Sequence, residues 1–349
     1  MSMMRDSGKV VTVTGPIEPR KLGVTMMHEH LFIDSRGFFS EPRSKEDRKR
    51  AHQPVTMDKI GWIKAHEEHH LANLHLDDEE TAIEEVLEFK KRGGGSIVDT
   101  TLRAIGRNPL GLKKVAQKSG LNIIAGTGYY TWEAHPKELA RKTVEEIAQE
   151  MIDEIEQGIE GTGVRSGIIG EVGTSHPLEQ NEKKVVKAAA RAQQATGASI
   201  TVHTGRDECS PWKVAGILEA EGATMDRVIM GHLDITTADM AKLEELARKG
   251  CCLEFDRFGS EGHFAWSDFD EPNDAGKVAL VKKLIDRGHV DQVVISLDVC
   301  SKVQLKRYGG YGYSHIVENV AGWMRTKGVT QEQLDQMLIE TPRRLLTLA

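Results

Sequence analysis

The sequence predicts an α/β protein, a closed (β/α)₈ TIM barrel with a long insertion after its first strand. Eight short apolar runs that end in polar residues alternate with amphipathic stretches that end in glycine. Strands that alternate with helices of this length are typical of βαβ units and a parallel sheet. Eight such units match a closed barrel, with an open doubly wound sheet as the alternative. The length of 349 residues suits one barrel domain over 1–349.

The expected strands can be placed along the chain in order. A hairpin-like segment at 10–16 comes first. The eight strands of the barrel then begin at Val24, Gly95, Asn122, Gly167, Ser199, Arg227, Cys251 and Gln292. The one large interruption is the insertion at 34–76, which lies between the first two of these strands.

Helices are expected between the strands. The stretch 77–93 begins with two aspartates and ends in lysines, an arginine and Gly93, the order of charges that a helix dipole favours. The stretch TTADMAKLEELARKG is expected to open on a threonine cap and to end at Gly250. The stretches before Gly197, Gly222 and Gly288 end in the same way, and the tail 314–349 reads as closing helices.

Two histidine clusters compete for a metal ion. The insertion contains AHEEHH, and on one helix this H-E-x-x-H spacing would place His66 and His70 around zinc, with Glu67 as the general base of a peptidase. The surrounding segment is rich in charged residues, histidine and glutamate, which favours a solvated helix that covers the barrel mouth. The zinc peptidase therefore remains a minor alternative.

The second cluster, MMHEHLF, lies in the first strand of the barrel. Side chains alternate along a strand, so His28 and His30 are expected to point together into the barrel and Glu29 toward the helical layer. Other strands end in further polar residues, and barrel active sites form at these carboxyl ends. Charges that face inward must be paired or coordinated, so the combination predicts a metal site. Its candidate ligands are His28, His30, Glu171, His203, His232 and Asp298.

Composition excludes several classes of protein. The net charge of −7 and the absence of a basic stripe argue against a nucleic-acid partner. No apolar run is long enough to span a membrane and none resembles a secretory signal, so we expect a cytoplasmic protein. Cysteines without a C-x-x-C pair are expected to be buried free thiols; they are Cys209, Cys251, Cys252 and Cys300.

The strand-end motifs resemble one known family. LGVTMMHEHLF, GEVGTS, VHTG, GHLD, FDRFG, SLDVC and, near the carboxyl terminus, ETPRRLL are similar to the phosphotriesterase-related branch of the amidohydrolase superfamily. This branch includes phosphotriesterases, phosphotriesterase-like lactonases and resiniferatoxin-binding homologues. The resemblance runs from about residue 11 to the end, without the insertion at 34–76.

The resemblance implies a binuclear metal centre. By motif, His28, His30 and Asp298 would hold the more buried ion, whereas His203 and His232 would hold the more exposed one. Many members bridge the two ions with a carboxylated lysine. The motif IIGEVG has no lysine and offers Glu171 instead, which suits a subset of the family and weakens the transfer of phosphotriesterase activity.

Imidazole and carboxylate ligands without thiolates suit Zn²⁺, Mn²⁺, Co²⁺ or Fe²⁺. We expect two divalent metal ions, with Zn²⁺ as the first candidate. Two such ions activate water and polarise the scissile bond. Asp298 is the expected catalytic residue, taking a proton from that water and passing it to the leaving group. Expected substrate contacts are Tyr130 and Arg257, both matching the lactonase-like pattern, and Arg107. An ion pair between Arg257 and Asp256 is the alternative.

These observations predict a binuclear metal-dependent hydrolase that attacks a carbonyl ester, first of all a lactone. The alternatives are an amidohydrolase of small N-acyl compounds and a phosphotriester hydrolase. A non-catalytic ligand-binding homologue would have lost at least one ligand, whereas all the expected ligand positions are filled here. The expected partner is a small-molecule substrate, and a homodimer is one expected assembly.

Overall fold

Eight parallel strands form the centre of the molecule. The structure is a computed structural model that describes residues 6–262 and 270–349. The sheet order is β12-β11-β10-β9-β8-β7-β6-β3. The strands are β3 (Val24–Glu29), β6 (Gly94–Asp99), β7 (Asn122–Thr127), β8 (Ser166–Gly173), β9 (Ile200–His203), β10 (Val228–Met230), β11 (Cys252–Phe255) and β12 (Val293–Ile295).

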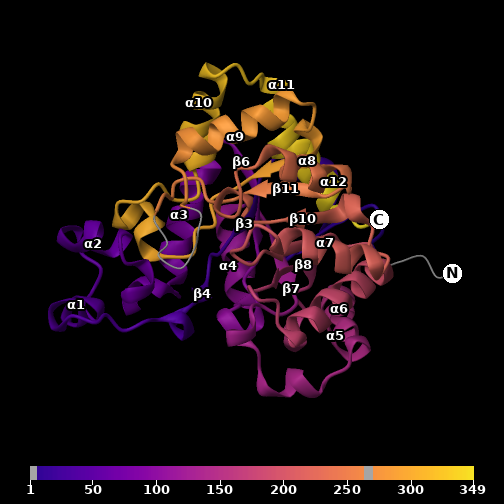
Figure 1. Cartoon of the computed structure of the whole chain (residues 1–349), viewed down its shortest axis with the longest axis horizontal. Helices are drawn as coiled ribbons and strands as arrows, with labels where there is room; N and C mark the ends of the chain where they lie inside the picture. The colour runs from indigo at the N-terminus through magenta and orange to yellow at the C-terminus, as the bar shows by residue number, and fades with distance from the viewer. Residues whose placement is uncertain (1–5, 263–269) are drawn as a thin grey trace.

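Hydrogen bonds just beyond the last strand bring the two edges of this sheet together. The backbone N–H of Asp298 donates to the carbonyl of His28 at 3.1 Å, and that of His30 donates to the carbonyl of Val299 at 3.2 Å. The sheet is therefore a nearly closed barrel, and helices surround it (Figure 1). The predicted (β/α)₈ fold and all eight predicted strands are confirmed.

The helices follow the strands as expected. They are α3 (Glu79–Lys91), α4 (Pro109–Ser119), α5 (Val144–Glu156), α6 (Gln180–Thr196), α7 (Ser210–Ala220), α8 (Met240–Arg248) and α9 (Asp274–Asp286), with α10 (Ala321–Thr326), α11 (Gln331–Asp335) and α12 (Thr341–Leu346) in the tail. Gly197 ends α6 with a φ of 68°, a conformation that glycine adopts without strain. The threonine cap predicted for α8 is wrong, because the carboxylate of Asp239 accepts the N–H groups of Ala241 and Lys242.

Two hydrophobic clusters alternate along the strands. The larger one combines strand and helix side chains such as Ile97 and Phe89, so it lies between the sheet and the helices. The smaller one takes the neighbouring strand residues, and alternation places it on the inner face of the barrel. Its members include Met27, Val98, Ile124, Ile168, Ile229, Cys252 and Val294, with Leu345 and Leu346 of α12.

An amino-terminal hairpin packs against this barrel. β1 (Val10–Thr12) pairs antiparallel with β2 (Gly15–Ile17), which confirms the predicted hairpin. Two of the cysteines, Cys251 and Cys252, are buried free thiols as predicted, but Cys209 is exposed because it lies just before α7. Within the described residues, no helix has the length and apolar character needed to cross a membrane.

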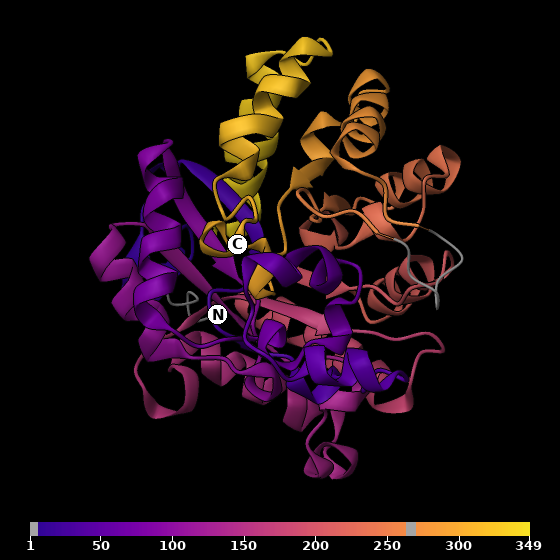
Figure 2. The same ribbon diagram turned by 90° about the vertical axis from the view of Figure 1, so that its left-hand side faces the viewer.

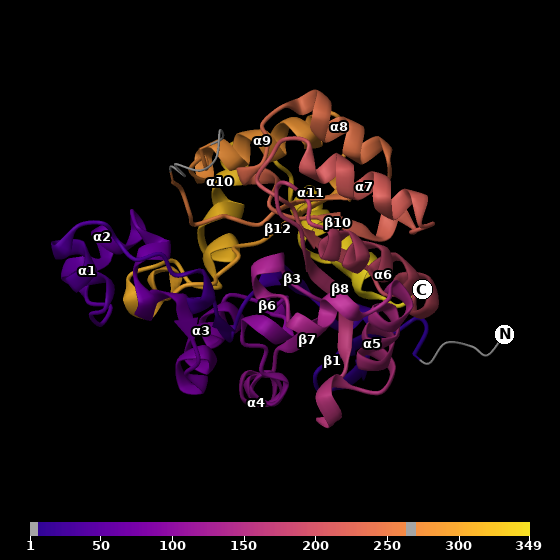
Figure 3. The ribbon, with the colours of Figure 1, turned by 60° about the horizontal axis from the view of Figure 1, so that its bottom comes forward.

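The helices of the insertion between the first two barrel strands are short. Its ends are joined by β4 (Ile33–Asp34) and β5 (His75–Leu76), which pair antiparallel. Between them lie α1 (Lys45–Ala51) and α2 (Ile60–Lys64), drawn in indigo at one end of the molecule beside the loop that follows β12 (Figure 3). The side-chain oxygen of Asn73 accepts the N–H of Val303 in that loop at 3.0 Å. Figure 2, which looks onto this end, shows the insertion in front of the barrel.

Candidate metal centre

The predicted ligands come together at the carboxyl ends of the strands. Glu171, on β8, lies among all four predicted histidines. Its Oε1 is 3.3 Å from Nε2 of His30, and its Oε2 is 2.9 Å from Nδ1 of His203. The same Oε2 lies 3.3 Å from Nε2 of His28 and 3.4 Å from Nε2 of His232. The two carboxylate oxygens thus face different histidines, as a bridging ligand would.

The charge of Glu171 is balanced by imidazoles. Burial opposes its ionised form, but the charge of His28 and the hydrogen bonds from His203 and His232 hold the pKa of this carboxylate well below its usual range. Among the described residues, its ion-pair partners are histidines and include no arginine. A role for Glu171 as the partner of an arginine is therefore not supported.

Asp298 completes the group at the end of β12. Its Oδ1 lies 3.2 Å from Nε2 of His30 and 3.9 Å from Nε2 of His28. Ligand atoms of His28, His30 and Asp298 all lie within 4.8 Å of one another, and so do those of His28, Glu171 and His232. The first trio is the set expected for the more buried ion. In the second trio His28 stands where the resemblance expects His203, although His203 Nδ1 is only 2.9 Å from Nε2 of His232.

Glu29 holds the turn that carries Asp298. Its carboxylate accepts the N–H groups of Leu297 and Val299, both at 3.0 Å, and the hydroxyl of Ser296 at 2.8 Å. Burial raises the pKa of Glu29 to about 8. The sequence predicted only that Glu29 points toward the helical layer and did not foresee this role, which arises because the turn offers buried N–H donors that need an acceptor.

Outer partners orient the imidazoles. Nδ1 of His28 lies 3.2 Å from carboxylate oxygens of both Glu254 and Asp256. Nδ1 of His232 is 2.8 Å from Asp256, and Nδ1 of His30 is 2.8 Å from the Thr101 hydroxyl. Such partners commonly set the tautomer and ring orientation of metal-binding histidines. Sequence reasoning missed them, although the alternation of Glu254 and Asp256 in CCLEFDRFG places two carboxylates on one strand face.

The residues present fit divalent metal ions. Nε2 of His28 is buried and has no hydrogen-bond partner, although it faces Glu171 and Asp298. A buried polar atom normally has a partner, so the isolation of this nitrogen among possible ligands fits a role in metal binding. Imidazole nitrogens and carboxylate oxygens without thiolates are a donor set that Zn²⁺, Mn²⁺, Co²⁺ and Fe²⁺ accept.

The centre opens into a large cavity of about 1720 Å³. Its wall includes Tyr130, His203 and Arg257 from the barrel and Glu67 from the insertion. The His203 side chain is 12% exposed, whereas those of His28, His30 and His232 are at most 2% exposed. Burial and the charge of His232 lower the pKa of His203 to about 3. A substrate in the cavity therefore meets the centre on its His203 side.

Tyr130 lies where the sequence predicted it. Its hydroxyl is 3.2 Å from Nδ1 of His203, and its side chain lines the cavity. Burial and the charge of Glu171 raise the pKa of Tyr130 well above its usual range, so the phenol stays protonated. A protonated hydroxyl at this position can donate a hydrogen bond to a group bound beside His203.

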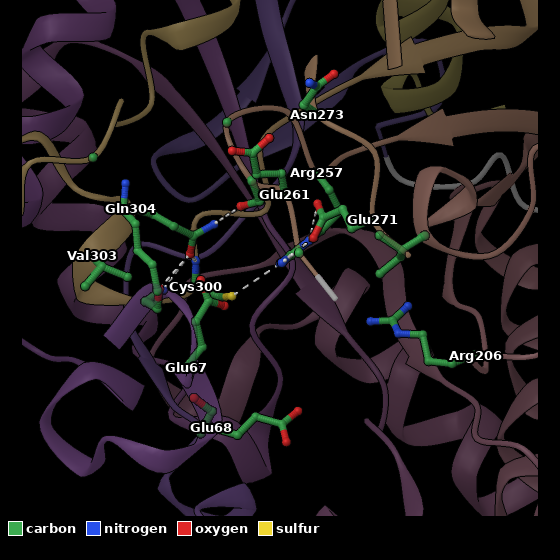
Figure 4. A pocket seen from close by; sticks show the side chains of 18 of the residues that line it. Glu67, Glu68, Arg206, Arg257, Glu261, Glu271, Asn273, Cys300, Val303 and Gln304 are labelled. Carbon is green, nitrogen blue, oxygen red and sulfur yellow. Dashed lines mark hydrogen bonds and ion pairs between the residues drawn. The ribbon is translucent and has the colours of Figure 1, made fainter. Parts of the chain in front are cut away.

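Arg257 also lines the cavity, but its charge is already compensated. Its guanidinium donates to Oδ2 of Asp298 at 2.9 Å and lies 3.4 Å from Glu271. The buried ammonium of Lys277 in turn lies 3.0 Å from Glu271. Figure 4 shows Arg257 beside Glu271. The partners of Arg257 are thus Asp298 and Glu271 and not Asp256, which faces His28 and His232.

Arg107 does not join the cavity. Its side chain is only 2% exposed and lies 2.6 Å from Glu154 of α5. It also donates to the carbonyl of Gly126 at 3.2 Å. The predicted substrate contact is therefore replaced by a buried structural ion pair, because Glu154 neutralises the guanidinium inside the barrel wall.

The HEEHH segment is not one helix, contrary to the prediction. α2 ends at Lys64, and His66 has a φ of −146°, outside the helical range. The His66 ring stacks on Trp62 at 4.6 Å between centroids, whereas His70 is buried. Glu67 lines the cavity instead of facing solvent. This backbone cannot present His66 and His70 on one helical face, so the geometry of a zinc peptidase is absent here.

The two histidine clusters should respond differently to mutation. His66→Ala is expected to leave the metal content unchanged, because this ring stacks on Trp62 outside the centre. His30→Ala should remove most of the bound metal, because it deletes a nitrogen that faces both Glu171 and Asp298. Elemental analysis of both variants, purified with divalent metal in the medium, checks this. Metal loss in His66→Ala with retention in His30→Ala would restore the peptidase hypothesis.

Comparisons with known proteins agree with this geometry. The model of the phosphotriesterase family matches residues 8–346. A phosphotriesterase-related protein of Nematostella vectensis is 41% identical over 346 residues, covering 98% of this chain and 99% of the relative. The N-acetyltaurine hydrolase of Danio rerio is 40% identical over 350 residues, covering 99% of both chains.

A solved structure has nearly the same fold. The resiniferatoxin-binding protein of Rhodobacter sphaeroides superposes with a TM-score of 0.95 at 34% sequence identity. The alignment covers 98% of this chain and 96% of that protein. The match of the family model over almost the whole length, together with these relatives, shows that the chain belongs to the phosphotriesterase family and is a metal-dependent hydrolase.

Proposed function

We propose that this hydrolase cleaves the amide bond of small N-acyl compounds, with N-acetyltaurine as the first substrate to test. The proposal depends mainly on the candidate ligand side chains that gather at the base of an open cavity. The 40% identity to an N-acetyltaurine hydrolase over the full length of both chains supports the choice of an amide. In this reaction water adds to the carbonyl carbon, the C–N bond breaks, and acetate and taurine are released.

Each ligand would have a defined place. His28, His30 and Asp298 would hold one ion, His203 and His232 the other, and Glu171 would lie between them. When bound, the two ions lower the pKa of water and polarise the carbonyl oxygen of the substrate. Glu254, Asp256 and Thr101 keep the imidazoles in the orientation that this arrangement needs.

Asp298 would carry the proton. Its carboxylate accepts a proton from the attacking water and returns it to the amide nitrogen as the C–N bond breaks. Arg257 holds Oδ2 of this carboxylate at 2.9 Å, and Glu29 holds the backbone on both sides of it. These contacts keep the Asp298 side chain in one orientation, so the same group can serve both proton transfers.

Tyr130 supports a lactone as the second candidate substrate. Its hydroxyl beside His203 matches the position of a tyrosine in lactonase-like members, where it lines the substrate pocket. A lactone and an amide present the same carbonyl to attack and differ in the leaving group. A phosphotriester is a weaker candidate, because Glu171 replaces the carboxylated lysine that many family members use as the bridge.

The experiment is a substrate screen with metal-loaded protein. N-acyl amides, lactones and phosphotriesters are assayed in parallel, before and after metal removal by a chelator. We expect turnover of N-acetyltaurine above the other classes, loss of this activity on chelation, and recovery when Zn²⁺ or Mn²⁺ is restored. Turnover of lactones without any amide hydrolysis would contradict the proposal and favour the second candidate.

A further inference from the structure

Arg206 is a cation in the cavity wall that forms no ion pair with the described residues of the chain. Arg206 lies in the loop after β9, in the segment HTGRD, three residues beyond His203. It is half-buried and lines the cavity. Figure 4 shows its guanidinium pointing into the cavity, with Arg257 and Glu271 across from it and Glu68 of the insertion on a third side.

The hydrogen-bonding capacity of Arg206 is largely unused. A guanidinium carries five N–H donors, and in the described part of the chain this one donates only to the carbonyl of Thr204, at 3.4 Å. Over residues 6–262 and 270–349, no carboxylate lies within the 4.0 Å of an ion pair with Arg206. Arg107 and Arg257, by contrast, are both held by carboxylates.

Arg206 lies on the side where the centre opens. Burial and the charge of His232 are the main causes that lower the pKa of His203, and the charge of Arg206 lowers it further. The charge of Arg206 also lowers the pKa of Tyr130, in opposition to burial, which raises it. A substrate whose carbonyl meets the centre beside His203 and Tyr130 therefore has this cation within its surroundings.

We propose that Arg206 binds the acid group of the substrate, so that the enzyme selects N-acyl compounds with a sulfonate or carboxylate on the amine side. This inference rests on the proposed amide hydrolysis. A guanidinium matches the spacing of two oxygens in either anion and forms charge-assisted hydrogen bonds with them. With the carbonyl at the metal centre and the acid at Arg206, the substrate has two fixed ends and one orientation.

A comparison with the other cationic side chains of the cavity supports Arg206 as the residue that binds the acid group. Arg257 is already compensated by Asp298 and Glu271. Lys64 and Lys327 also line the cavity, but both residues are exposed. Arg206 combines partial burial with unused donors, and partial burial makes an unpaired charge costly until an anion arrives.

The test compares an anionic and a neutral substrate. Wild type, Arg206→Gln, Arg206→Lys and the control Lys327→Gln are loaded with Zn²⁺, and their metal content is measured. Steady-state kcat and KM are then determined for N-acetyltaurine and for N-acetylethanolamine, which carries a neutral hydroxyl at a similar place. Binding of ethanesulfonate, an anion without an amide, is measured by calorimetry on the same four proteins.

We expect Arg206→Gln to lower kcat/KM for N-acetyltaurine by about 10- to 100-fold, mainly through KM, as the loss of charge-assisted hydrogen bonds predicts. Its kcat/KM for N-acetylethanolamine should stay unchanged, Arg206→Lys should retain part of the preference, and Lys327→Gln should behave as wild type. Ethanesulfonate should bind wild type more tightly than Arg206→Gln.

The remaining outcomes separate the two proposals. An equal loss on both substrates, or ethanesulfonate binding that does not depend on Arg206, would overturn the assignment of Arg206. If wild type hydrolyses neither amide but ethanesulfonate binding still depends on Arg206, the proposed amide hydrolysis is wrong and the anion site is supported.

Discussion

Asp298→Asn is expected to lower kcat of the metal-loaded enzyme by about 10²- to 10⁴-fold, the range typical for loss of a general acid-base group. Asparagine keeps the shape of the side chain but cannot accept a proton from water or return it to the leaving group. In addition, Arg257 and His30 would lose the negative charge that they face. The measurement is kcat at saturating substrate, with metal content determined on the same sample.

Asp239→Asn is the matched control for this substitution. Asp239 caps α8 through its side chain, and asparagine is an equally good helix cap. The control should therefore retain the activity and stability of wild type. An Asp298→Asn enzyme that holds its full metal content and turns over at the wild-type rate would exclude Asp298 as the proton carrier.

Glu171→Gln is expected to remove about half of the bound metal, so that occupancy falls from two ions per chain toward one, because a neutral amide cannot neutralise two cations. The ion held by His203 and His232 should be lost first, since the resemblance places it at the more exposed site, and His203 is the more accessible side chain. Elemental analysis at controlled free Zn²⁺ measures the ratio. Activity should fall with the second ion.

Glu154→Gln separates loss of metal from loss of stability. Glu154 is buried and pairs with Arg107 away from the cavity. Weakening this pair leaves a buried guanidinium without a full counter-charge, which lowers the melting temperature but should leave both metal ions in place. If Glu171→Gln behaves in the same way, with a lower melting temperature and full occupancy, Glu171 does not bridge the two ions.

Local sequence patterns were sufficient to predict the barrel and the residues that gather as candidate ligands. Strand and helix periods are properties of neighbouring residues, so all eight barrel strands could be placed from the apolar runs alone. Parallel strands bring their carboxyl ends to one edge, so polar residues at these ends had to converge. The meeting of His30, Glu171 and Asp298 follows from this topology.

The roles of the arginines could not be predicted in this way. An arginine binds a substrate anion only if no carboxylate of the protein reaches it first, and that depends on residues far away in the chain. Arg107 meets Glu154, 47 positions later, whereas Arg257 meets Asp298, 41 positions later. Arg206 meets no such carboxylate in the described residues, and its sequence surroundings do not reveal this difference.

The conformation of the HEEHH segment also depended on distant contacts. Its spacing suits a helix, but the ring of His69 bonds to the carbonyl of Ser40, and Glu67 turns into the cavity. These contacts outweigh the weak intrinsic preference of a short polar segment for helix.

The sequence by itself determined the barrel, its strand order and the residues that gather at its mouth, because these follow from periodicity and from the direction of parallel strands. Only the tertiary structure decided which histidines are oriented by Glu254 and Asp256 and which arginines are paired with carboxylates, because these hydrogen bonds and ion pairs join residues far apart in the chain, such as His28 and Glu254, 226 positions apart.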